Sequence, residues 1–278
     1  MDWIDALIMG IVQGLAEYLP ISSSGHLEIF RNILGIDLSG DVALEFDVAL
    51  HIATVLSTIV VLWREFVPLC TSFFTFRHDD NFWYVCKILV SCIPVAIVGL
   101  CFKDVIEQFF GSGLLLVGIC LLVTAMLLSF AYFTRTKPAL ENPSAATRGH
   151  DVTWFDAFII GCAQAVAVLP GLSRSGTTIA TGIMLGDRRD KVAQFSFFMV
   201  IIPILGEALL GIKDIISGES ATTAAIGAIP LTIGFIASFV VGCIACKWML
   251  EIVKRGKLVW FAVYCVAMGL TCILWDLF

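Results

Sequence analysis

Six long apolar runs divide the chain into two groups of three, and a shorter apolar segment precedes each group. Each run is near the roughly 20 residues that a helix needs to cross about 30 Å of hydrocarbon. Because the runs are continuous and do not alternate between apolar and polar positions, they predict membrane helices and not the strands of a β-barrel. The predicted spans are Phe46–Trp63, Tyr84–Phe102 and Gly113–Thr134 in the first half, and Val192–Ile212, Thr223–Lys247 and Leu258–Leu277 in the second.

The two shorter segments, Ile4–Leu19 and Phe155–Leu169, run into a proline, Pro20 or Pro170. A turn rich in Ser and Gly follows, and then a second short apolar piece. Two short pieces around such a break predict a re-entrant helical hairpin and not two spans. Irregular backbone at membrane depth is tolerated only where it is buried in protein or lines a wet cavity.

The two halves of the chain resemble each other in register. At an offset of 151 residues, 10 of the 23 positions from Trp3 to Gly25 are identical to their counterparts. We interpret this as a duplication inside a single membrane domain, 1–278, with a first repeat at 1–134, a linker at 135–153 and a second repeat at 154–278. Since three spans is an odd number, the second repeat is expected to be inverted relative to the first.

Composition and charge support this all-α, polytopic membrane fold. The chain is 59% apolar and 14% charged, whereas a soluble domain is about a quarter charged. With the predicted spans, 13 Lys and Arg residues fall on one side and 3 on the other. The positive-inside rule then places the 135–153 linker in the cytoplasm and both termini outside it. No basic stripe with interleaved aromatics points to nucleic acid.

The first hairpin carries a cluster of polar groups at predicted membrane depth, where such groups are costly and usually functional. Gln13 and Glu17 are four residues apart and share a helix face. The serines at 22–24 can cap the next helix, which places His26 in its first turn. Gly10 and Gly14 would let another backbone approach, either within the chain or between subunits.

The second hairpin places Arg174 between Ser173 and Ser175 at a helix N-terminus. The helix dipole, free N–H groups and a planar guanidinium suit a phosphate. If the hairpin tips meet, Glu17, Ser23, His26 and Arg174 would form a site for phosphoryl or acyl transfer, and the arginine favours phosphoryl transfer.

Other candidate residues are more ambiguous. His51 either packs in the interior or lines the cavity, and both alternatives stay open. His78 and His150 lie in polar loops and are expected to be solvated. Cys243 and Cys246 form a CxxC pair inside an apolar run, where buried thiols behave as small apolar side chains.

These motifs resemble the bacterial undecaprenyl-diphosphate phosphatases of the bacitracin-resistance type, over essentially the whole chain. The most specific segments are Gln13-x-x-x-Glu17, Leu19–His26 and Pro170–Gly176, with support from Gln194–Phe197. The resemblance implies an inner-membrane enzyme with six spans and two re-entrant hairpins. Such an enzyme converts undecaprenyl diphosphate to undecaprenyl phosphate outside the cytoplasm, which recycles the peptidoglycan carrier lipid and confers bacitracin resistance.

The resemblance also implies roles for particular residues. Ser23 would be the nucleophile, His26 its acid/base partner and Glu17 a further catalytic carboxylate. A divalent cation, Mg²⁺ or Ca²⁺, would bind at Glu17 and Gln13, although many family members have Glu where this chain has Gln13. The phosphates would bind Arg174, Ser173, Ser175, Thr178 and Ser24.

One further departure from the family concerns the last span. Many members have an arginine after the tyrosine there, whereas Tyr264 is followed by Cys265 in this chain. The role of that arginine therefore does not transfer to this protein. Partners implied by the resemblance are the polyprenyl diphosphate, membrane lipids and a second copy of the chain in a homo-oligomer.

A secondary transporter or flippase of an anionic lipid is the alternative function. Inverted repeats, broken helices and polar groups near the membrane midplane are common in transporters. The distinguishing feature is the combination of Ser23 and His26 on one hairpin with Arg174 on the other. A carrier would not need a nucleophile and a base.

Overall fold

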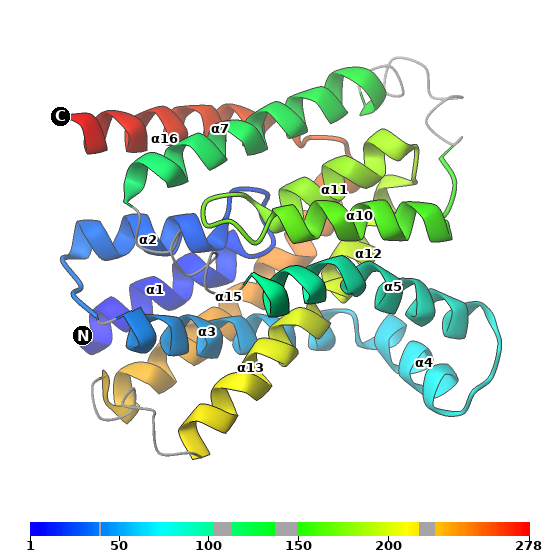
Figure 1. The fold of residues 1–278 in the computed structure, drawn as a ribbon, viewed down its shortest axis with the longest axis horizontal. Helices are drawn as coiled ribbons and strands as arrows, with labels where there is room; N and C mark the ends of the chain where they lie inside the picture. Colours follow the sequence, from blue (N-terminus) through cyan, green and yellow to red (C-terminus); the bar gives the residue numbers. More distant parts are fainter. Residues whose placement is uncertain (39, 103–112, 137–148, 217–225) are drawn as a thin grey trace.

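The computed structural model describes residues 1–38, 40–102, 113–136, 149–216 and 226–278 (Figure 1). Within these ranges the chain forms helices and one isolated bridge, between His150 and Asp187. Six helices are long and apolar enough to cross a membrane, in agreement with the sequence prediction. Their bounds are Val42–Val61, Asp80–Cys101, Leu114–Arg135, Arg189–Leu209, Ala228–Lys254 and Val259–Leu277.

Each half begins with two short helices and also contains longer ones. The first half contains α1 (Trp3–Ala16), α2 (Ser23–Leu34), α3 (Gly40–Val61), α4 (Trp63–Phe74), α5 (Asp80–Cys101), α7 (Leu114–Ala131) and the π-helical turn η1 (Tyr132–Thr136). The second half contains α10 (Trp154–Val166), α11 (Arg174–Leu185), α12 (Arg189–Met199), α13 (Ile201–Ile216), α15 (Ala228–Lys254) and α16 (Val259–Leu277).

The predicted fourth span is broken into α12 and α13 at Val200. Pro203 explains the break, because it has no N–H to donate to the carbonyl of Met199 four residues earlier. That carbonyl accepts instead from the Cys92 thiol, at 3.5 Å. Helix α4 was not predicted from the sequence; it follows α3 as a separate helix and places Leu69 inside and Phe74 outside.

The short helices have the same local structure in both halves. A capping box begins α1, formed by Asp2 and Asp5, and another begins α10, formed by Thr153 and Asp156. Helices α2 and α11 are each 12 residues long and each end at a left-handed glycine. The 151-residue correspondence seen in the sequence therefore extends to helix starts and helix ends.

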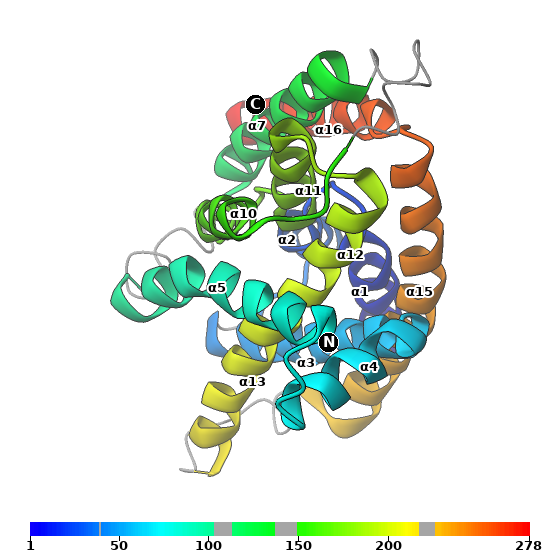
Figure 2. The same ribbon diagram turned by 90° about the vertical axis from the view of Figure 1, so that its right-hand side faces the viewer.

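The packing also crosses between the halves, as Figures 1 and 2 show: α1 packs against α15, α10 against α5, and α7 against α16. Small residues allow these contacts. A Cβ added to Gly10 would lie 2.3 Å from the Gly234 carbonyl oxygen, and one on Gly161 would lie 2.3 Å from the Ser91 carbonyl oxygen. Gly10 and Gly14 thus allow close packing within the chain, which was one of the two predicted alternatives.

The outer surface of the helices is apolar. All seven tryptophans are exposed, as are long aliphatic side chains along α5, α15 and α16. Exposed tryptophans of this kind are typical of the interface between hydrocarbon and water. The chain is thus a multi-pass, all-helical membrane protein, whose buried polar groups need a separate explanation.

Candidate active site

The turn after α1 and the turn after α10 touch in the interior. The Ser175 hydroxyl donates to the Leu19 carbonyl at 3.1 Å, and a Cβ on Gly25 would lie 3.1 Å from the Gly171 Cα. Gly171 has a φ of 89°, a left-handed conformation that glycine adopts without strain. This contact brings the N-termini of α2 and α11 together, and both helix ends favour negative charge.

Two serines at equivalent positions cap these helices. The Ser22 hydroxyl accepts from the Gly25 N–H at 3.2 Å, and the Ser173 hydroxyl accepts from the Gly176 N–H at 3.1 Å. Ser173 also donates its own N–H to the Thr124 hydroxyl, at 3.1 Å. Since both serines are buried and bonded in this way, each has a structural function that is sufficient to explain it.

Glu17 is the centre of the polar cluster, although its carboxylate is only 6% exposed. One oxygen, Oε1, accepts from the Arg174 guanidinium. The other, Oε2, accepts from the Ser23 hydroxyl at 2.8 Å and from the Gln13 amide at 3.0 Å. The prediction that Gln13 and Glu17 share a helix face is confirmed, and the two halves of the chain meet at one carboxylate.

His51 lies beside this carboxylate and not in the apolar packing. Its Nε2 atom is 3.5 Å from Glu17 Oε2, and its Nδ1 donates to the Asp47 carbonyl at 2.7 Å. Helix α3 therefore places a histidine beside the Glu17 carboxylate.

His26 is held by two hydrogen bonds in the first turn of α2. Its Nδ1 lies 2.8 Å from the Ser22 carbonyl oxygen, which can only accept, so Nδ1 carries the proton. Its Nε2 is 2.7 Å from the Tyr264 hydroxyl, which donates to a neutral ring. Ser23 donates to Glu17 instead, so the expected pairing of Ser23 with His26 stays a prediction.

Tyr264 is the functional candidate that sequence reasoning missed. In the sequence this tyrosine stands out only as the neighbour of Cys265. It comes from α16, 238 residues after His26, and its ring stacks on the imidazole with centroids 5.6 Å apart. The signal available in the sequence was a polar hydroxyl inside an apolar span, because polar groups at such positions are often functional.

The remaining predicted residues bond to groups other than the Glu17 carboxylate and the Arg174 guanidinium. Thr178 contacts the Ser196 hydroxyl at 2.6 Å and donates to the Arg174 carbonyl at 2.8 Å. Ser24 lies 3.4 Å from the Ser22 hydroxyl. The predicted residues are thus brought to one region, and Glu17, Ser23 and Arg174 are in direct contact.

A small cavity opens beside Glu17 and Arg174. Tyr18 lies on its wall, and the tyrosine hydroxyl is bonded to the Thr54 carbonyl at 2.6 Å and to the hydroxyls of Ser57 and Thr58. The cavity is therefore partly polar although it lies among spanning helices. Its lining residues are Glu17, Tyr18, Thr54, Val55, Thr58, Arg174, Ser175, Ser196, Phe197, Val200 and Ile204.

Comparison with known proteins places this arrangement in a family. The family described as "Bacitracin resistance protein BacA" matches residues 6–271. A protein of Bacteroides fragilis named undecaprenyl-diphosphatase is 53% identical over 273 residues, 98% of each chain. Proteins of the same name from Parabacteroides distasonis, 52% identical over 98% of each chain, and Christiangramia forsetii, 43% identical over 99% of this chain and 98% of the other, are also similar. The chain belongs to the bacitracin resistance protein BacA family.

Proposed function

We propose that this protein hydrolyses undecaprenyl diphosphate to undecaprenyl phosphate and inorganic phosphate at the Glu17 cluster. The observation that carries the proposal is the hydrogen bond from the Ser23 hydroxyl to Glu17, together with Arg174 on the other carboxylate oxygen. A hydroxyl within reach of a base, beside a guanidinium, is the equipment for phosphoryl transfer. The relatives' shared name supports this substrate, and it gives no support to a transporter.

The chemistry begins when the diphosphate enters between the N-termini of α2 and α11. The Arg174 guanidinium then releases the Glu17 carboxylate and binds phosphate oxygens through two parallel N–H groups. Glu17 then takes the proton of Ser23 as the serine oxygen forms a bond to the terminal phosphorus. The bond from that phosphorus to the bridging oxygen breaks, and undecaprenyl phosphate leaves with the electron pair.

A water molecule completes the reaction. It attacks the phosphoserine, the Ser23–phosphorus bond breaks, and inorganic phosphate is released while Glu17 returns the proton to the serine. His26, fixed by Ser22 and Tyr264, lies one turn along the same helix and can exchange protons with water during this step. Direct attack by water on the diphosphate, with Glu17 as the base, is the alternative route to the same products.

A divalent cation, Mg²⁺ or Ca²⁺, fits the residues present. The Gln13 amide oxygen is buried and has no hydrogen-bond partner among the described residues, and it lies on the same helix face as the Glu17 carboxylate. Both are oxygen donors of the kind that these cations prefer. Glu17 and Gln13 would hold the ion, and when bound it would neutralise charge on the diphosphate.

The proposed membrane arrangement has inverted repeats, two re-entrant hairpins and both termini outside the cytoplasm. Supporting it, Gly118 and Gly269 are 151 residues apart, and a Cβ on either would lie within 2.8 Å of the other's carbonyl oxygen. Such a reciprocal contact is what a two-fold axis produces. An alkaline phosphatase fused after Phe278 should be active, since that enzyme needs an oxidising compartment. An inactive, fully expressed fusion would contradict this topology.

The activity itself is tested with purified protein, undecaprenyl diphosphate in detergent, and a measurement of released phosphate. Ser23→Ala and Arg174→Ala should each lower the rate by about 10²–10³-fold. Arg255→Ala is the matched control, because Arg255 is exposed and pairs with Glu251 at the far end of α15. Normal turnover by folded Ser23→Ala would exclude the covalent route and leave attack by water.

A further inference from the structure

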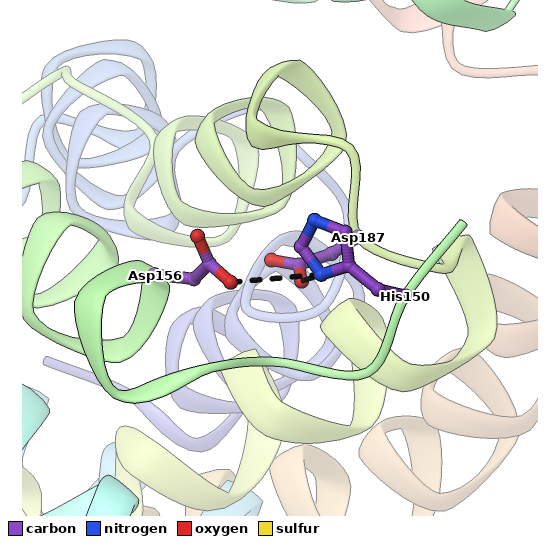
Figure 3. A group of neighbouring side chains, drawn as sticks. All are labelled: His150, Asp156 and Asp187. Atoms are coloured by element: carbon purple, nitrogen blue, oxygen red, sulfur yellow. Dashed lines mark ion pairs between the residues drawn. The ribbon is translucent and has the colours of Figure 1, made fainter. Parts of the chain in front are cut away.

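A second cluster of ionisable side chains lies away from the Glu17 site, where the ends of α10 and α11 meet (Figure 3). His150 precedes α10, Asp156 is in the first turn of α10, and Asp187 follows α11. The His150 Nδ1 atom is 3.1 Å from Asp187 Oδ1 and 3.7 Å from Asp156 Oδ2. His150 was expected to be solvated. Although its ring is about half exposed, its Nδ1 faces two carboxylates.

Asp187 is the unusual member of this cluster. Its side chain is fully buried, and neither carboxylate oxygen has a hydrogen-bond donor among the described residues. The His150 Nδ1 atom is near it, but the same atom lies 3.2 Å from the Asp151 carbonyl oxygen and has one proton to donate. Burying a carboxylate without compensating bonds is costly, so some further positive charge is expected here.

The first repeat shows that the fold does not need this carboxylate. Ile36 occupies the position equivalent to Asp187, and its N–H donates to the Arg31 carbonyl just as the Asp187 N–H donates to the Gly182 carbonyl, each at 3.0 Å. A hydrophobic residue is the usual choice after a helix that ends in this way. The second repeat therefore has a buried carboxylate at a position where the first repeat, with the same backbone hydrogen bond, has an apolar side chain.

Asp187 also lies beside a second carboxylate, that of Asp156. Asp156 itself is 5% exposed and is held in place by the Thr153 N–H and hydroxyl, at 2.9 and 2.6 Å. Two carboxylates are thus fixed close together, and the imidazole alone does not balance them.

We propose that His150, Asp156 and Asp187 bind a divalent transition-metal ion of the Zn²⁺ or Mn²⁺ class. One imidazole nitrogen and two carboxylate oxygens suit these ions better than Mg²⁺ or Ca²⁺, which prefer oxygen alone. The potential ligand atoms all lie within 4.8 Å of one another. Ligands at the usual 2.0–2.1 Å from a tetrahedral zinc are about 3.3 Å apart. Water would complete the coordination on the exposed side of His150.

The ion would join the beginning of α10 to the end of α11. Arg174 lies at the other end of α11, and 12 residues at 1.5 Å each separate the two ends by about 18 Å. The ion is therefore distinct from any cation at Glu17. Its expected effect is to fix the helix that presents Arg174, so its binding is measurable without any reaction.

The test uses the full-length protein, purified in detergent and freed of metal with a chelator. ZnCl₂ and MnCl₂ are titrated separately by calorimetry, and thermal unfolding is recorded with and without each ion. One ion per chain should bind and raise Tm by several degrees. Asp187→Ile should weaken binding at least 100-fold and should fold, because the equivalent position holds Ile36. His150→Ala should weaken binding at least 10-fold.

Asp5→Asn is the matched control. Asp5 occupies the position of Asp156 in the first repeat, and it caps α1 with Asp2 as its partner. This variant should bind the ion as the wild type does, as should Glu17→Gln. The proposal is overturned if the wild type binds neither ion at 1 mM, if Asp187→Ile binds normally, or if Glu17→Gln alone abolishes binding. Phosphatase activity is not the readout, so failure here leaves the proposed function intact.

Discussion

Replacing Glu17 with Gln tests the site most directly, because the amide has the size of the carboxylate but neither its charge nor its basicity. The carboxylate accepts the Ser23 hydroxyl and pairs with Arg174. Loss of a general base costs about 10²–10⁴-fold in rate. Breaking a fully buried ion pair costs about 3–5 kcal/mol, but Arg174 is 27% exposed and Gln can still accept one hydrogen bond. We expect a loss of about 1–2 kcal/mol in the free energy of unfolding.

The measurement combines phosphate release with unfolding in detergent, and adds Arg174→Gln and the double variant. Each single variant leaves one charged partner uncompensated. The loss in the free energy of unfolding of the double variant should therefore be smaller than the sum of the two single losses, by about 1–3 kcal/mol.

Asp47→Asn is the control, since Asp47 also forms a part-buried pair with an arginine, Arg31. It should lose stability but keep its turnover within about threefold. Glu17→Gln with normal turnover, or strictly additive stability losses, would refute the assignment of Glu17 as the base paired with Arg174.

Three further predictions concern the surroundings of the site. Tyr264→Phe removes the hydroxyl that donates to His26 Nε2, a bond worth about 1 kcal/mol, so kcat/KM should fall about fivefold and its pH profile should shift. An unchanged pH profile would mean that His26 takes no part in proton transfer. Gly118→Ala places a Cβ 2.7 Å from the backbone of α16 and should cost about 1–3 kcal/mol, visible as a lower Tm. Ser196→Ala removes a partner of Thr178, which retains its bond to the Arg174 carbonyl, so stability should fall by at most about 1 kcal/mol with little change in rate; a large rate loss would instead place Ser196 in contact with substrate.

The sequence predicted the six spans correctly because spans depend on a local pattern, whereas the duplication, read from another local pattern, stays a prediction. Hydrophobic run length determines whether a helix can cross the bilayer, and matching residues at a fixed offset identify repeated segments. The i,i+4 relation of Gln13 and Glu17 is of the same kind, since helix geometry alone places them together. The break between α12 and α13 was also visible in Pro203, but its effect was overlooked within an otherwise apolar run.

Contacts between distant elements were not available from local patterns. Nothing near Tyr264 in the chain indicates that its hydroxyl meets His26, because that contact depends on how α16 and α2 each pack against α7. The Ser23 hydroxyl was expected to pair with His26, whereas in the structure it donates a hydrogen bond to Glu17. Asp187 is a candidate ligand because its side chain is buried, and burial is not evident from a polar loop sequence.

The bond between His26 and Tyr264 also bears on how the protein is made. His26 belongs to α2 and Tyr264 to α16, so a ribosome adds this partner 238 residues after the histidine. Arg174 reaches Glu17 earlier, but only after more than half of the residues have been synthesised. A chain that ends before Arg174 would therefore lack the cation paired with Glu17, and one that ends before α16 would lack the partner of His26.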